Sequence, residues 1–546
     1  MPAESESHDA SSGLGAKSES GKTGARVQLE GVTLQAGDRL LLKGASAEFL
    51  PGQVTLIVGP SGVGKTLLLR AIAGLIDGST PGITTEGAIR VGESLAGSGT
   101  PSTVGVVFQN FALFDELSSQ DNVRFAAAHR NSRTGRAGGD EDQLTPLQLL
   151  DELGVPGDVR TASLSGGQRQ RLAIARTLAY GAEVILYDEP TSGLDQVTAE
   201  RVADLIRRTH DRHPRTSIIV THDYQALSRI ADRVYLLDPA AKSLVEIPQT
   251  QWDKLHDLLA SGAGLARHDT VEKPPNLARR GLARLGDLLI GTTRAAEQVA
   301  FLPLSLLPRW KSMHWGCRYL WHYLRLVADP SAWLYVALAG GIIGFVATYF
   351  TFRFLPYRGY TEPLIIENLL EGVGFSLYRI LVPILIALLV AARCGAAVAS
   401  DLGGKVYGQQ IDALRTFGIR PERYLLTGVM YAFLLGTPLL TMIGFFVARL
   451  VSLVVFLEMH PGRGPYFWDA HFHRQLELPG QLFYAGSAWM LAKVLCCAAG
   501  AGCIAYVLGM RPKHSSTDIS RGITRTILWS TLHVLIVHLV FALLEF

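Results

Sequence analysis

The apolar residues of this chain are unevenly distributed, and this constrains its fold more than any other feature. Up to about residue 250 the sequence has the mixed composition of a soluble α/β protein, whereas beyond residue 330 long runs carry almost no charge. A chain of 546 residues also exceeds what one hydrophobic core usually organises. The sequence therefore predicts a soluble α/β domain followed by an all-α membrane domain.

Five runs in the second half are long enough to span a bilayer, which takes about 20 apolar residues. The runs are 333–352, 377–399, 425–457, 483–509 and 527–546. The third is longer than a span requires, and Pro438 within it predicts either a kink or a tilted helix. Five spans are expected, with six as the alternative.

Basic residues concentrate in two of the loops between these runs. The loops are 400–424, with Lys405, Arg415, Arg420 and Arg423, and 510–525, with Arg511, Lys513, Arg521 and Arg525. Because cytoplasmic loops are enriched in Lys and Arg, these two loops are expected on the cytoplasmic side. The protein is then a multi-pass inner-membrane protein with a cytoplasmic first domain and its C-terminus on the outer side.

Ionisable residues also occur in or beside the runs, namely Arg379, Arg393, Arg449, Lys493, His533 and His538. A proton or substrate path is one interpretation. For the Arg and Lys residues we favour snorkelling of the charged end toward the membrane surface.

Charge and cysteine content say less about function. The net charge of +3 argues neither for nor against nucleic acid as a partner, and no nucleic-acid partner is expected. All five cysteines lie in the second half, mostly within apolar runs, so neither a disulfide framework nor a metal site is expected. Residues 1–26 are polar and lack the apolar stretch of a signal peptide, which predicts a disordered tail.

A phosphate-binding loop follows a short apolar strand in the first half. The strand VTLIV (54–58) leads into GPSGVGKT (59–66) and then into a helical run. Glycines in this setting let backbone N–H groups surround a phosphate at a helix N-terminus, while the lysine contacts the β- and γ-phosphates and the threonine hydroxyl binds Mg²⁺. The expected ATP ligands here are Gly59, Ser61, Gly62, Gly64, Lys65 and Thr66.

Two consecutive acids end a second apolar strand, AEVILYDEP (182–190). Asp188 is placed to bind Mg²⁺, and Glu189 to orient and activate the attacking water. Between this strand and the phosphate loop lies LSGGQ (164–168), by which the domain resembles an ABC ATPase. In that family the helix N-terminus at Ser165, Gly166, Gly167 and Gln168 receives a γ-phosphate.

Other elements of the same resemblance follow in order. Gln109 is expected to contact Mg²⁺ and to sense the permease, and His222 to contact the γ-phosphate. The segment 192–195 (SGLD) also matches. One departure is the hairpin GVTLQAGDRL, where Leu34 stands at the position expected for an adenine-stacking aromatic residue, and this predicts weaker nucleotide affinity.

The expected domain boundaries are 1–26 for the tail, 27–250 for the nucleotide-binding domain, 251–329 for a linker and 330–546 for the permease. Within the linker, residues 282–307 combine helical apolar spacing with basic residues. We expect an amphipathic helix in the membrane interface there, with a soluble helical hairpin as the alternative.

The loop ARCGAAVASDLGGKVYGQQIDALRTFGIRPERYL and the last run of the chain resemble the MlaE permease family, and the ATPase resembles its MlaF partner. The resemblance implies a coupling segment at Gln409, Gln410 and Asp412 that docks near Gln109. It also implies a phospholipid cargo and a periplasmic MCE-type lipid-binding partner. Gln409 and Ile380 replace acids that are common in the family, so any salt bridges made by those acids must be absent or rebuilt.

An ABC site is composite, with Lys65 and Asp188 of one domain facing residues 165–168 of another. One ATPase and one permease per chain therefore predict a homodimer with two ATP and Mg²⁺ between the ATPase domains. An ABCG-type half-transporter for sterols or drugs is an alternative, although the short, basic loop 510–525 disfavours it. A nucleotide-gated regulator is a further alternative, disfavoured by the intact Lys65, Asp188, Glu189 and His222.

Overall fold

The computed structural model describes residues 24–76, 80, 82–92, 94–96, 103–130, 145–255, 307–308, 310–354, 358–477, 483–513 and 515–545. The chain divides into two compact units, each described here by itself. Unit 1 comprises Met1–Gln109 and Gly181–Thr270, and unit 2 comprises Asn110–Tyr180 and Val271–Phe546. The expected interfacial helix at 282–307, apart from Leu307, and the expected tail at 1–26, apart from residues 24–26, lie outside the described residues. The expected domain boundaries remain a prediction.

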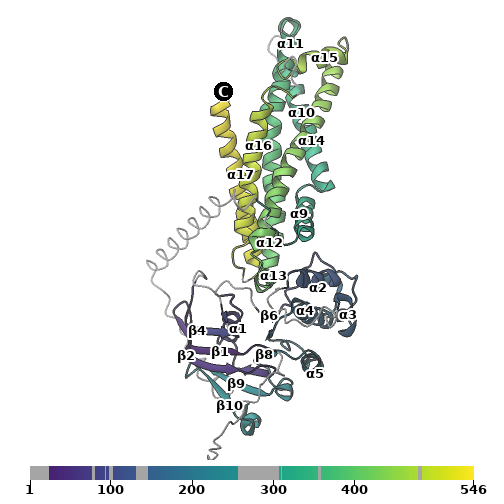
Figure 1. Cartoon of the computed structure of the whole chain (residues 1–546). Coiled ribbons are helices and arrows are strands. Elements are labelled where there is room, and N and C mark those ends of the chain that lie inside the picture. Colours follow the sequence, from purple (N-terminus) through teal and green to yellow (C-terminus); the bar gives the residue numbers. More distant parts are fainter. Residues whose placement is uncertain are drawn as a thin grey trace, which may run out of the picture. The chain divides into compact units, whose positions relative to one another are not determined.

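Unit 1 contains two sheets (Figure 1). Its elements are β1 (Val27–Ala36), β2 (Arg39–Phe49), β3 (Val54–Val58), α1 (Lys65–Ile72), β4 (Ile83–Val91), β5 (Ser94–Leu95), β6 (Val104–Val107), β7 (Val184–Asp188), α5 (Gln196–Arg212), β8 (Thr216–Thr221), η4 (Ser228–Ile230), β9 (Arg233–Asp238), β10 (Ser243–Ile247) and η5 (Gln249–Lys254). The larger sheet has the order β10-β9-β3-β8-β7-β6 and the smaller, antiparallel one the order β2-β1-β4-β5.

The larger sheet is parallel from β9 to β6. Every residue of β3, β6, β7 and β8 is buried. Continuous runs of Val, Ile and Leu suit strands that are covered on both faces, which is the usual situation in parallel sheets. The sheet thus brings the carboxyl ends of β3, β6, β7 and β8 to one edge.

Unit 2 joins a small helical subdomain to a long helical bundle. Its elements are α2 (Ser119–Ala128), α3 (Pro146–Glu152), η3 (Thr161–Ser163), α4 (Gly166–Tyr180), α9 (Met313–Val327), α10 (Pro330–Arg353), α11 (Arg358–Ser376), η6 (Leu377–Leu381), α12 (Val382–Tyr407), α13 (Gln410–Thr416), η7 (Glu422–Leu426), α14 (Thr427–Met459), α15 (Pro465–Phe472), α16 (Ser487–Gly509) and α17 (Ser516–Glu545). Figure 1 shows α13 at one end of the bundle and α11 and α15 at the other.

Within the described residues, five helical segments are long and apolar enough to cross a membrane, as the sequence predicted. They are Met313–Arg353, Ile365–Tyr407, Glu422–Met459, Ser487–Gly509 and Ser516–Glu545. Several extend well beyond the predicted runs because hydropathy identifies only the apolar part of a helix. The helix α14 continues through Pro438 from Thr427 to Met459. The protein is therefore a multi-pass membrane protein.

Small residues allow α10 and α14 to pack closely. A Cβ atom added to Gly340 would overlap the carbonyl oxygen of Gly444, and one added to Gly344 would overlap that of Ala448. One turn further, Thr348 Oγ1 donates a hydrogen bond to Ser452 Oγ over 2.7 Å. Small residues four apart are the usual means by which membrane helices approach each other in the absence of a hydrophobic driving force.

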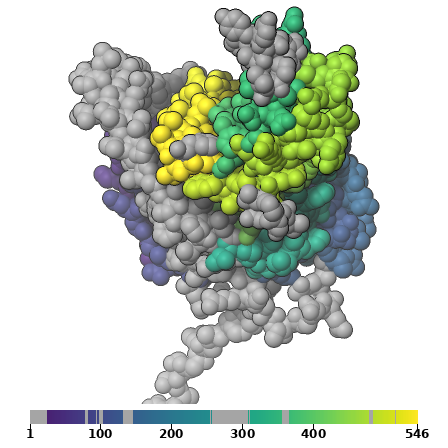
Figure 2. All heavy atoms as spheres, turned by 90° about the horizontal axis from the view of Figure 1, so that it is seen from above, coloured from purple at the N-terminus to yellow at the C-terminus, as the bar shows by residue number. Residues whose placement is uncertain are grey.

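Arg379, Arg393, Arg449 and Lys493 are each paired with a carboxylate, a contact that the snorkelling interpretation did not include. Arg393 Nη2 lies 2.7 Å from Asp329 Oδ1, and Arg449 Nη2 lies 3.2 Å from Asp469 Oδ1. Glu545, in the last turn of α17, contacts Arg379 at 2.5 Å and Lys493 at 2.8 Å. Unpaired charge in an apolar surrounding is costly, which accounts for the pairing. Figure 2 shows α17, in yellow, at the surface of the bundle at the end opposite α13.

Candidate ATP site and coupling site

Four predicted site segments follow four neighbouring strands of the parallel sheet. The phosphate loop follows β3, Glu189 follows β7, His222 follows β8, and Gln109 comes shortly after β6. Since carboxyl ends of parallel strands share one edge, the fold of unit 1 assembles residues that lie far apart in the sequence. Gln109 is exposed at this edge.

The phosphate loop turns through two glycines with positive φ, Gly62 at 78° and Gly64 at 107°. Gly64 is the N-cap of α1, and a Cβ added there would lie 3.2 Å from Leu41. Both the dihedral angle and the close neighbour therefore disfavour other residues at this position. The loop leaves its backbone N–H groups at the start of a helix, where anions bind readily.

Lys65 is 4% exposed and its ammonium group lies inside the loop. Its Nζ donates hydrogen bonds to the carbonyl oxygens of Gly59 at 2.9 Å and Pro60 at 3.0 Å. Glu189 Oε1 lies 3.8 Å from the same atom. Burial lowers the pKa of Lys65, and the carboxylates of Glu189 and Asp188 oppose this change. The amine is thus held where a phosphate would meet it.

Thr66 and Asp188 present oxygen atoms at one point. Thr66 Oγ1 donates a hydrogen bond to Asp188 Oδ1 over 2.9 Å. Asp188 is 2% exposed, and burial raises its pKa, with a further contribution from the neighbouring Glu189. A buried carboxylate beside a hydroxyl is the hard-oxygen ligand set that suits Mg²⁺, so the residues present fit this ion.

Glu189 has a backbone conformation that is uncommon for a residue with a side chain, with φ at 47°. Its N–H donates a hydrogen bond to the carbonyl oxygen of Val220 over 2.9 Å, which fixes this turn against β8. The side-chain Oε1 lies 3.2 Å from His222 Nδ1. A strained residue at a strand end between a lysine and a histidine is typical of a functional site.

The segment 164–168 belongs to unit 2, where it begins α4. Ser165 and Gln168 form a capping box: the Ser165 N–H donates to Gln168 Oε1 at 3.0 Å, and the Gln168 N–H donates to Ser165 Oγ at 3.3 Å. Ser165, Gly166 and Gly167 are exposed, and a Cβ added to either glycine would meet no atom within 4 Å. The structure thus places these residues at an open helix N-terminus.

Unit 2 also holds the predicted coupling residues. Gln410 is 5% exposed, and its Nε2 donates a hydrogen bond to Asp115 Oδ2 over 2.9 Å. Gln409 caps α13 with φ at 59°, and Asp412 lies 3.8 Å from Arg415 of its own helix. Of the three, Gln410 is the residue for which the described structure records a hydrogen bond to the segment that follows Gln109.

Comparisons with known proteins agree with both halves of this arrangement. Residues 42–192 match the family ABC transporter, and residues 327–544 match the family Permease MlaE. The aliphatic sulfonates import ATP-binding protein SsuB 2 of Burkholderia cenocepacia is 38% identical over 205 residues, which are 37% of this chain and 70% of that protein. The chain belongs to the ABC transporter family.

Two further similarities concern the ATPase part. The sulfate/thiosulfate import ATP-binding protein CysA of Acinetobacter baylyi is 36% identical over 234 residues, 42% of this chain and 64% of that protein. The chain thus spans less than two thirds of the length of CysA. A dimeric ATP-binding cassette solved in a post-hydrolysis state with ADP and Pi is 28% identical, with a TM-score of 0.34 over 40% of this chain and 96% of that one.

One expectation about this ABC ATPase domain is wrong. Leu34 is 1% exposed and pairs with Leu42 of β2 and Thr85 of β4, so its side chain belongs to the core and cannot stack on a base. Alternate residues of a strand point to opposite faces, and a shift of one position reverses the face. At the turn of this hairpin the exposed residues are Gly37, Asp38 and Arg39.

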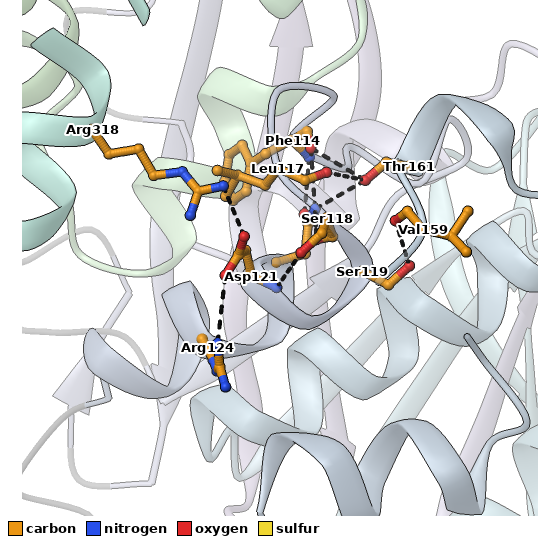
Figure 3. A network of polar contacts seen from close by, with 10 residues as sticks. Phe114, Leu117, Ser118, Ser119, Asp121, Arg124, Val159, Thr161 and Arg318 are labelled. Atoms are coloured by element: carbon orange, nitrogen blue, oxygen red, sulfur yellow. Dashed lines mark hydrogen bonds and ion pairs between the residues drawn. The ribbon is translucent and has the colours of Figure 1, made fainter. Parts of the chain in front are cut away.

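The structure adds contacts from the ABC helical subdomain to α9 and α12 that sequence reasoning missed. Arg318 of α9 lies 2.7 Å from Asp121 of α2, and Ser118 caps α2 by accepting a hydrogen bond from the Asp121 N–H over 3.1 Å (Figure 3). Lys405 lies 2.8 Å from Asp401 and 3.6 Å from Glu116. Asp401 lies four residues before Lys405 on the same helix, whereas nothing local in the sequence indicated Glu116 as a second partner.

An aromatic cluster accompanies these ion pairs. Phe125 of α2 is fully buried, with ring centroids 5.1 Å from both Phe114 and Trp315. His129 Nε2 lies 2.9 Å from Tyr424 Oη, and burial lowers the pKa of His129 to about 4. The helix α9, which forms the first part of the segment Met313–Arg353, thus packs on the subdomain together with η7.

Proposed function

We propose that this chain is one half of an ATP-driven transporter that moves a phospholipid, or a similar lipid, across or out of the inner membrane. The observation that carries the proposal is the match of residues 327–544 to Permease MlaE in the same chain as an ABC ATPase domain. That match extends from the last residue of α9 into the last turn of α17. ATP hydrolysis supplies the energy for transport.

In the ATPase domain, the glycine loop with Ser61 encloses the β-phosphate, and Lys65 contacts the β- and γ-phosphates. Thr66, Asp188 and Gln109 hold Mg²⁺, which neutralises phosphate charge when it is bound. Glu189 orients and activates the attacking water, and His222 contacts the γ-phosphate. The 3.2 Å contact between Glu189 and His222 and the 2.9 Å hydrogen bond from Thr66 to Asp188 support these assignments.

The working unit is a homodimer. The open helix N-terminus at Ser165–Gln168 is the group that completes an ATP site on a second copy, because a helix N-terminus favours a γ-phosphate. Two ATP molecules then lie between two ATPase domains. The permease domains of the two copies enclose the lipid between them.

When the two ATPase domains close on ATP, α13 transmits their movement to the membrane part. Gln410 supports this role through its hydrogen bond to Asp115, while Gln409 and Asp412 shape the same short helix. The ATPase domain is cytoplasmic and the C-terminus lies on the outer side, in accordance with the basic loops 400–424 and 510–525. A periplasmic MCE-type protein is the expected partner on the outer side.

The test replaces Glu189 by Gln and uses full-length protein in vesicles that contain phospholipid. The variant keeps Mg²⁺-ATP binding but loses turnover, at least about 100-fold if this carboxylate activates the water. The matched control is Glu183→Gln, which changes an acid just before β7, at the edge of the sheet opposite the site. Normal ATP hydrolysis by E189Q would contradict the catalytic assignment. ATPase activity that does not change when phospholipid is present would contradict phospholipid as the cargo.

A further inference from the structure

An arginine in the second half of α4 is buried among groups that carry no negative charge. Arg176 is 1% exposed, and the hydrogen-bond acceptors that the described residues offer it are backbone carbonyl oxygens. Burial lowers the pKa of Arg176 to about 9, so the guanidinium keeps its charge at neutral pH. A buried charge is costly unless the groups around it offset that cost. The proposed ATP chemistry does not use this side chain.

The carbonyl groups belong to the loop that follows Gln109. Arg176 Nη1 donates a hydrogen bond to the carbonyl oxygen of Ala112 over 2.5 Å, and Nη2 donates one to that of Phe111 over 3.1 Å. Phe111 and Ala112 both have positive φ, 61° and 50°. This backbone region is unfavourable for residues that carry a Cβ atom. The two hydrogen bonds therefore stabilise a loop conformation that the loop alone would not favour.

The same guanidinium also contacts the end of α13. Its central carbon lies 5.6 Å from the centre of the Phe417 ring and 5.3 Å from that of Phe114. A cation within about 6 Å of an aromatic ring centre is attracted to the ring. Phe417 is 4% exposed and is the C-cap residue of α13. The end of this short helix is therefore packed against the cation that holds the loop.

The helix α13 thus has a contact with the segment after Gln109 at each of its ends. At its start, Gln410 donates its hydrogen bond to Asp115. At its end, the Phe417 ring and the loop carbonyls share one buried cation, and both offset the cost of its burial. Displacement of either partner weakens the interactions of the other, and groups that share a partner in this way are energetically coupled.

We infer that Arg176 is a positioning residue that couples the loop after Gln109, and the helix α4, to α13. The inference rests on the proposed function, in which the N-terminus of α4 meets ATP and α13 transmits movement to the membrane part. A shift of α4 or of the loop moves the guanidinium, and the guanidinium moves the Phe417 ring. Lysine cannot take this role, because its ammonium group lacks the planar face and the fixed fork of donors.

The test uses the full-length variant Glu189→Gln, which retains ATP under the proposed function. Hydrogen–deuterium exchange of residues 110–116 and 410–417 is measured with and without Mg²⁺-ATP, and both segments are expected to respond. Addition of Arg176→Lys should reduce the ATP-dependent change at 410–417 by about tenfold, as for loss of one hydrogen bond to a charged group. Phe417→Leu, which removes the ring and leaves the carbonyl contacts, should reduce it while 110–116 still responds.

Arg124→Lys is the matched control, because it makes the same change of cation on α2, where the side chain is 53% exposed. It should keep both responses. A purely structural role would alter exchange equally with and without ATP, and if R176K does not fold, F417L alone decides. An ATP response at 410–417 that persists in these variants overturns the inference alone. If 410–417 does not respond to ATP in E189Q itself, the proposed role of α13 fails and the inference fails with it.

Discussion

The side-chain amide of Gln410 donates a hydrogen bond to Asp115 Oδ2 over 2.9 Å, and this contact joins α13 to the segment that follows Gln109. Burial, and then the neighbouring Glu116, raise the pKa of Asp115, whereas the amide of Gln410 lowers it. A neutral donor is therefore suited to this carboxylate, and a second acid would not be.

Replacement of Gln410 by Glu places two carboxylates together and removes the donor. Hydrogen bonds to charged groups contribute about 1.5–3 kcal/mol, so lipid-stimulated ATPase activity should fall while basal activity in detergent remains. Asp115→Asn in the same chain restores an amide–carboxylate pair with the roles exchanged. Recovery of stimulation in the double variant is expected, and equal losses in the single and double variants would count against this contact as a coupling link.

His129 should make the stability of unit 2 depend on pH. Burial holds its pKa at about 4, below the value of about 6.5 for a free imidazole. Unfolding then takes up a proton between these values, so stability is complete above pH 6.5 and falls as the pH decreases toward 4, by about 3 kcal/mol in total.

Thermal unfolding at pH 5 and pH 7.5 checks this dependence. The variant His129→Gln should show a smaller difference between the two pH values. The exposed His314→Gln is the control and should keep the wild-type difference. An unchanged pH dependence in H129Q would contradict the prediction.

The close approach of α10 and α14 predicts that Gly344 tolerates no larger residue. A Cβ at Gly344 overlaps the Ala448 carbonyl oxygen, and Val there should destabilise the bundle by about 1–3 kcal/mol or more through overpacking. Gly341 lies on the same helix, where an added Cβ would be 3.6 Å from its nearest neighbour, Val451. Gly341→Ala should therefore unfold in detergent at the wild-type temperature, and equal effects of both variants would refute the packing argument.

Glu545 should be required for stability because it is the carboxylate shared by Arg379 and Lys493. Its side chain is 1% exposed, and that of Lys493 is 4% exposed. Removing one partner of a buried ion pair typically costs about 3–5 kcal/mol, so Glu545→Gln should lower the unfolding temperature in detergent strongly. Glu458→Gln, which removes an exposed acid from α14, should have little effect. Wild-type stability of E545Q would show that the two cations do not depend on this carboxylate.

Local sequence patterns predicted much of the ATP site and of the bundle. The glycine loop, the two acids after β7 and the histidine after β8 each carry their chemistry in a few adjacent residues, so their types and order were readable without a structure. The five spans were equally accessible because a bilayer requires a long apolar run. The ends of these helices could not be predicted in the same way, because the helices continue past the apolar region into polar sequence.

Partners that lie far apart in the chain could not be predicted from one sequence. The carboxylates of Glu545, Asp329 and Glu116 face Arg379, Arg393 and Lys405 respectively, and they come from segments that only the tertiary structure brings near. The burial of Leu34 likewise depends on the register of β1 between β2 and β4, which one residue of shift would reverse. The sequence by itself determined which chemical groups this protein has and in what order. Tertiary structure decided which of them meet, because contacts at a few ångströms depend on the packing of whole helices and strands.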